Sequence, residues 1–89
     1  MEPKELKEVT DIIIKGAKGE VPNFKEDEAV EFEAKAIKII SDSSNDLVIA
    51  KFSPIMNMNI LDLNIHFFDY LPRIWACIQN ASEICVREA

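Results

Sequence analysis

Three side chains that could hold a metal ion lie close together in the second half of the chain. Asp62, His66 and Asp69 follow one another at spacings of four and three residues, and His66 is the only histidine. On a helix the three would share a face and offer one nitrogen and two oxygens to a divalent cation. On a strand Asp62 and His66 would share a face without Asp69. The set lacks the fourth protein ligand of a structural zinc site, so we favour a polar face that meets water.

The two cysteines, Cys77 and Cys85, offer a second kind of chemistry. A thiolate nucleophile would need a base such as His66 within hydrogen-bonding distance. The cysteines are eight residues apart in a segment that we expect to be helical, which separates their backbones by about 12 Å and excludes a disulfide between them. Buried free cysteines usually act as small hydrophobic side chains, and that is the role we expect here.

A run of acidic residues in the first half could bind calcium or imitate a polyanion. The run consists of Glu26, Asp27, Glu28, Glu31 and Glu33. It lacks the alternating Asp and Asn ligands and the central glycine of a calcium-binding loop. We therefore expect a solvated edge whose like charges discourage pairing with other chains.

Length and charge limit the function classes. The chain has 89 residues and a net charge of −6, which predicts one small globular domain over residues 1–89 and argues against a nucleic-acid partner. Its two glycines, Gly16 and Gly19, cannot form a glycine-rich loop that cradles phosphate, and we expect no cofactor.

The location of the protein is predicted from what its sequence lacks. No apolar run approaches the roughly 18 residues that a membrane span needs, and the first residues do not resemble a secretion signal. We expect a cytoplasmic protein that does not enter a membrane.

Two segments have the spacing of amphipathic helices. Leu6, Val9, Ile13 and Ala17 recur at three- and four-residue steps and predict a helix over residues 3–18, ended by Gly16 or Gly19. Pro72 suits the first turn of a second helix. Its apolar stripe contains Leu71, Ile74, Trp75, Ile78, Ala81 and Cys85.

The middle of the chain shows alternation that we interpret as β-structure. In residues 28–40, Val30, Phe32, Ala34 and Ala36 alternate with charged side chains, although Glu, Ala and Lys favour helices. The polar residues 41–46 then resemble a turn, residues 47–52 a second strand, and residues 61–67 a third. The predicted fold is α+β, with an N-terminal helix, a three-stranded antiparallel meander and a C-terminal helix, both helices covering one face of the sheet. An all-α bundle is the alternative, because residues 26–41 and 57–70 also fit helical wheels.

The apolar segment between residues 47 and 78 suggests a binding surface. No Lys or Arg occurs between Lys51 and Arg73, and one helical layer would leave part of this apolar supply exposed. We predict a small non-enzymatic domain that binds a protein partner, most simply a second copy as a homodimer. The candidate contacts are Phe52, Met56, Met58, Phe68 and Tyr70. The alternatives are a metal-binding protein or metal enzyme centred on Asp62, His66 and Asp69, and an acidic inhibitor that imitates nucleic acid.

Overall fold

The computed structural model describes residues 4–79, and this part of the chain consists of helices and the turns that connect them, with no β-strand. Three α-helices come first: α1 (Lys4–Ala17), α2 (Glu26–Ser41) and α3 (Asn45–Met56). Two short 3₁₀ helices follow, η1 (Ile60–Asp62) and η2 (Ile65–Phe68), and a further helix runs over residues 72–79. The predicted α+β fold is therefore wrong, and the all-α alternative fits.

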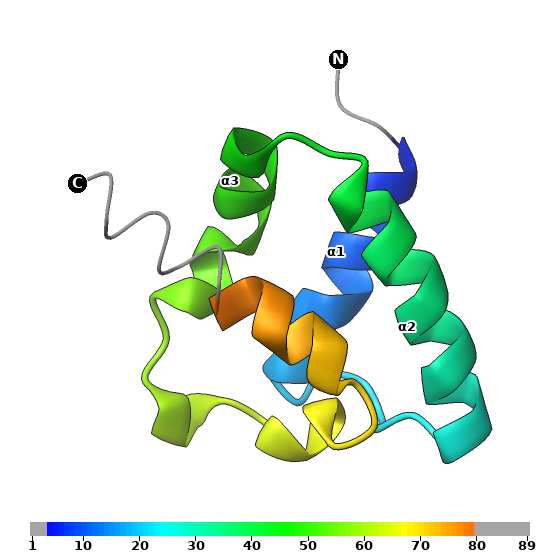
Figure 1. Cartoon of the computed structure of the whole chain (residues 1–89). Coiled ribbons are helices and arrows are strands. Elements are labelled where there is room, and N and C mark those ends of the chain that lie inside the picture. Colours follow the sequence, from blue (N-terminus) through cyan, green and yellow to red (C-terminus); the bar gives the residue numbers. More distant parts are fainter. Residues whose placement is uncertain (1–3, 80–89) are drawn as a thin grey trace.

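Helix α1 is the central element. It contacts α2, α3 and η2, and Figure 1 shows it behind the 72–79 helix with α2 and α3 on either side. Its stripe of Leu6, Val9, Ile13 and Ala17 is at most 2% exposed. The burial of this stripe confirms the helix predicted for residues 3–18. Pro3, the first residue of that prediction, lies outside the described residues.

The end of α1 is fixed by a glycine turn. Gly19 has a φ of 76°, a left-handed conformation that side chains with a Cβ rarely adopt. The amide of Glu20 donates to the carbonyl of Lys15 at 2.8 Å, and the amide of Gly19 donates to that of Gly16 at 3.1 Å. This pair of bonds is a Schellman motif, which satisfies carbonyl groups that the helix leaves unpaired.

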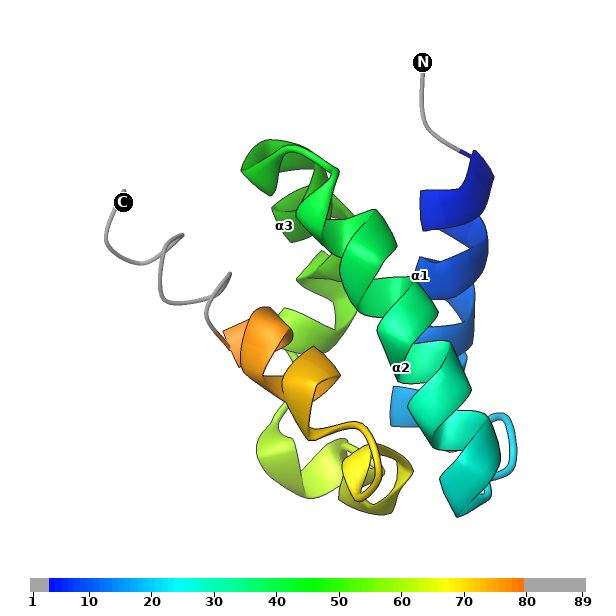
Figure 2. The same cartoon turned by 45° about the vertical axis from the view of Figure 1, so that its right-hand side comes forward.

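The strand predicted for residues 28–40 is instead most of α2. Ala29, Ala36 and Ile40 are buried, with spacings of seven and four residues that place them on one helical face. Val30 belonged to the alternating pattern but is 63% exposed. The segment is thus a helix, in agreement with the helix propensity of Glu, Ala and Lys, and Figure 2 shows α2 lying alongside α1.

The predicted hairpin is a connection between two helices. Ser44 is the N-cap of α3, and its side chain accepts a hydrogen bond from the amide of Leu47 at 3.3 Å. Residues 47–52, the predicted second strand, therefore lie within helix α3. The polar cluster at 41–46 does form a turn between two elements. Because serine is a preferred N-cap residue, such a cluster can precede a helix as readily as it can connect two strands.

Pro54 lies inside α3 and does not end it. Because proline has no amide proton, the carbonyl of Ala50 loses its usual donor four residues on. The hydroxyl of Ser53 donates to this carbonyl at 3.0 Å and replaces the missing bond. The helix continues for two more residues, to Met56, and this end of α3 borders the candidate site.

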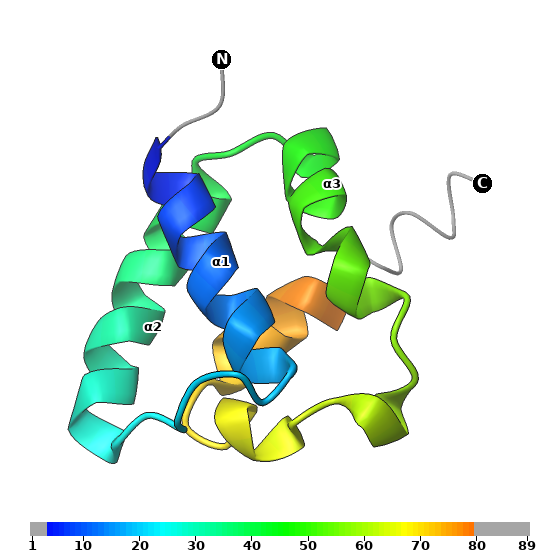
Figure 3. The ribbon, with the colours of Figure 1, turned by 180° about the vertical axis from the view of Figure 1, so that it is seen from behind.

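The predicted third strand, residues 61–67, consists of η1, η2 and the link between them. Leu61 is 87% exposed while Phe67 is 2% exposed, so the alternating side chains do not share a face. The side chain of Asn59 caps η1 by accepting from the amide of Leu61 at 3.0 Å. Figure 3 shows both short helices along the edge of the molecule below α1 and α3.

Candidate functional site

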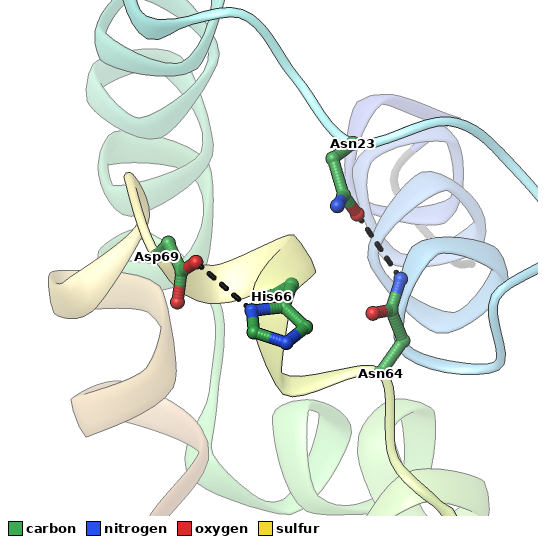
Figure 4. Close-up of polar contacts among 4 residues, drawn as sticks. All are labelled: Asn23, Asn64, His66 and Asp69. Carbon is green, nitrogen blue, oxygen red and sulfur yellow. Dashed lines mark hydrogen bonds and ion pairs between the residues drawn. The ribbon is translucent and has the colours of Figure 1, made fainter.

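The predicted metal ligands do not converge. His66 Nδ1 lies 3.2 Å from an Asp69 carboxylate oxygen, and both side chains are largely exposed, at 80% and 55% (Figure 4). Among residues 4–79 no three His, Cys, Asp or Glu side chains form a group that could hold a metal ion. Asp62 therefore does not complete a set with His66 and Asp69.

Asn64 has a structural role that the sequence analysis did not assign. Its backbone amide donates to the carbonyl of Ala17 at 2.7 Å. Its side-chain amide donates to the carbonyl of Gly16 at 3.3 Å and to Asn23 Oδ1 at 3.1 Å, the latter drawn in Figure 4. Asn64 thus joins the end of α1 to the segment that carries η1 and η2.

The acidic run is divided between solvent and a structural contact. Glu26, Asp27 and Glu28 occupy the first turn of α2, where negative charge is favourable beside the helix N-terminus. Glu33, two turns later, accepts a hydrogen bond from the backbone amide of Arg73 at 2.9 Å. Since Arg73 is the second residue of the 72–79 helix, Glu33 acts as its N-terminal cap from another element.

Cys77 is a half-buried free thiol, and Cys85 lies outside the described residues. Burial raises the pKa of Cys77 above its ordinary value of 9.0; Arg73 opposes this rise and Glu33 adds to it. A raised pKa keeps the group protonated near neutral pH, whereas a nucleophilic cysteine needs a lowered pKa. The geometry agrees with the packing role expected of this residue.

The five predicted contact residues fall in three places. Phe52 and Phe68 are core residues, 1% and 5% exposed, so a partner cannot reach them in this conformation. Tyr70 is 51% exposed in the turn after η2. Met56 and Met58 are half-buried and lie together in one wall of an apolar groove.

This groove, of about 170 Å³, is the candidate site. It lies between the end of α3, the segment that follows α3, and the 72–79 helix, elements that Figures 1 and 2 show next to one another. Its apolar lining consists of Ile55, Met56, Met58, Ile60, Leu63, Trp75 and Ile78. Gln79 also lines the groove, and none of the lining residues within residues 4–79 is charged.

Trp75, which lines the groove, is held in place by the aromatic core. The ring of Trp75 packs against Phe68 with 5.1 Å between centroids, and Phe68 meets Phe67 edge-on at 5.3 Å. Aromatic pairs at these distances are favourable, and Phe67 is in turn fully buried. Trp75 is therefore a fixed part of the groove, in keeping with the anchor position that its helix stripe predicts.

Exposed apolar side chains continue from the groove along the chain. Ile60, Leu61 and Ile65 are 54%, 87% and 45% exposed. Ile60 also lines the groove, and Leu61 is its direct neighbour in η1. The alternation of residues 61–67 concealed this surface, since it predicted Leu61 and Phe67 to face the same way.

Comparisons with protein-family models, curated proteins and solved structures found no match. In addition, no helix among the described residues has the length and apolar character needed to cross a membrane. The geometry of the groove is therefore the main indication of function.

Proposed function

We propose that this protein is a small non-enzymatic interaction domain that binds another polypeptide through the groove between α3 and the 72–79 helix. The observation that carries the proposal is the composition of the groove: of the eight described residues that line it, seven are apolar and none is charged, on a chain of net charge −6. Apolar surface that extends from a pocket to exposed neighbours is typical of a protein-binding site.

The side chains of the groove suit the side chains of a partner protein. Met56 and Met58 are unbranched and polarisable, so they can adjust to the shape of an inserted group. Trp75 supplies a large rigid surface of the kind that contributes strongly to binding at interfaces. The described lining is thus made of side chains that bind by apolar contact, which supports a binding role.

We also propose a cytoplasmic location. Cys77 is a free, half-buried thiol, and free thiols persist in the reducing cytosol. Two contacts favour the interaction function over a metal-binding or nucleic-acid-mimic function: His66 and Asp69 form a surface pair, and Glu33 caps a helix.

Site-specific photo-cross-linking in the organism that makes the protein tests this function. Benzoylphenylalanine would replace Ile60, which is 54% exposed and lines the groove, or Val30, which is 63% exposed on α2 and serves as the control. We expect a covalent adduct with a polypeptide from position 60 and none above background from position 30. Equal adduct yields at the two positions, or none at either, would contradict the proposal.

A further inference from the structure

The exposed side chain of Leu61, next to the groove in the sequence, suggests which group the groove binds. Leu61 has the highest exposure, 87%, of the large hydrophobic side chains in the described part of the chain. It lies in η1, a short helix that Figures 1 and 3 show at an outer corner of the molecule, and it directly follows Ile60, which lines the groove. Building on the proposed function, we infer that the partner is a second copy of this chain, and that each copy inserts Leu61 into the groove of the other.

The size of the groove fits this occupant. An apolar cavity of about 150 Å³ is known to accept a benzene-sized group, so a groove of about 170 Å³ accommodates one leucine side chain. The pairing can be reciprocal because Leu61 directly follows Ile60, which lines the groove, so that one region of the chain carries both the inserted side chain and its receptor. A two-fold dimer requires this arrangement, in which one patch contains both complementary parts.

The distribution of charge favours a copy of the same chain. Near a two-fold axis each side chain lies close to its own counterpart, so a charged residue there would meet the same charge. No Asp, Glu, Lys, Arg or His occurs from Phe52 to Leu61, and the 72–79 helix contributes only Trp75, Ile78 and Gln79 to the groove. Although each copy carries −6, the groove lining itself brings no like charges together, and Asp62, which directly follows Leu61, is the nearest charged residue in the sequence.

Light scattering coupled to size exclusion tests the inference on the full chain. We expect twice the chain mass of 10.1 kDa at high protein concentration, with dissociation on dilution. Leu61→Asp would place a carboxylate in an apolar groove and should raise the dimer dissociation constant roughly thirtyfold or more, while Leu61→Met keeps the dimer. Val30→Asp adds the same charge on α2 and should leave the mass at high concentration unchanged.

Several results would overturn the inference. Leu61 is so exposed that its substitution should leave the circular dichroism of the monomer unchanged, so a loss of mass cannot be attributed to unfolding. A mass of 10.1 kDa at every concentration, or a dimer that Leu61→Asp does not weaken, would exclude this dimer. Cross-links from position 60 to a different polypeptide would then leave the proposed function standing. Cross-links from position 60 only to residues of the same molecule would overturn both proposals.

Discussion

The ring of Phe67 lies directly over Gly16, in the space that a Cβ atom at position 16 would occupy. Gly16 is buried in the last turn of α1, and Phe67 of η2 is 2% exposed. Phe67 also contacts Phe24, with 5.4 Å between ring centroids. The absence of a side chain at Gly16 thus allows the segment that carries the candidate site to pack onto the central helix.

Replacing Gly16 with alanine tests this contact. Helix propensity alone predicts that the change stabilises α1 by about 1 kcal/mol. Overlap with the Phe67 ring predicts the opposite sign, a loss of about 1–3 kcal/mol in the free energy of unfolding, measured with urea. The Phe67→Leu background should recover part of this loss, and stabilisation by Gly16→Ala in the wild-type background would contradict the account.

Thr10 presents a buried polar atom without a partner. The residue is 1% exposed in α1, and its hydroxyl oxygen makes no hydrogen bond. Replacing the hydroxyl with a methyl group, Thr10→Val, should raise the free energy of unfolding by about 1 kcal/mol because an unsatisfied polar group no longer has to be buried. Thr10→Ser keeps the hydroxyl and loses a methyl contact, so thermal unfolding should show the reverse shift.

Asn64 should contribute to stability through its two side-chain hydrogen bonds. Asn64→Ala leaves the carbonyl of Gly16 and the side chain of Asn23 without this donor, and we expect a loss of about 1–2 kcal/mol in urea unfolding. Asn57 is an exposed residue of the same type at the end of α3 and provides the control. An Asn57→Ala variant as destabilised as Asn64→Ala would show that these bonds contribute nothing special.

Cys77 should make the protein less stable in alkali. Its pKa is raised above 9.0 in the folded state, so the unfolded chain loses this proton at lower pH than the folded chain. The stabilisation is present below pH 9 and is lost as pH rises through the folded pKa, because unfolding then releases a proton. Urea unfolding at increasing pH should show a smaller alkaline decline for Cys77→Ser than for the wild type, and identical declines would contradict the raised pKa.

Salt should strengthen the proposed dimer. Two copies of net charge −6 repel each other over the whole surface, while the contact itself is apolar. Screening therefore reduces the repulsion and leaves the attraction intact. Sedimentation equilibrium should give a lower dimer dissociation constant at high salt, whereas a weaker dimer would indicate an association held by opposite charges.

Part of the fold followed from the sequence because some helical stripes have no competing interpretation. Leu6, Val9, Ile13 and Ala17 fit only a period of 3.6 residues, and Pro72 correctly marks the start of the last described helix. Residues 28–40 satisfy periods of two and of 3.6 together. Ala29 and Ala36 are buried together on one face of a helix, and a local pattern cannot reveal which of its two possible faces will be buried.

The groove was only partly predictable for the same reason. Met56, Met58 and Trp75 drew attention by type, and all three line it. Their convergence depends on the packing of the α3 end against the 72–79 helix, and the exposure of Leu61 depends on the short 3₁₀ geometry of η1. Neither relationship is encoded in the spacing of neighbouring residues.

The most direct test of the interaction function is cross-linking from position 60 in proteins with and without Met58→Asp. Met58 lines the groove beside Ile60, so a carboxylate at position 58 should prevent an apolar partner group from entering. The account predicts a polypeptide adduct from position 60 that disappears when Met58→Asp is added, while circular dichroism shows that the helices persist. An adduct of undiminished yield in the Met58→Asp protein would mean that the groove is not where the partner binds.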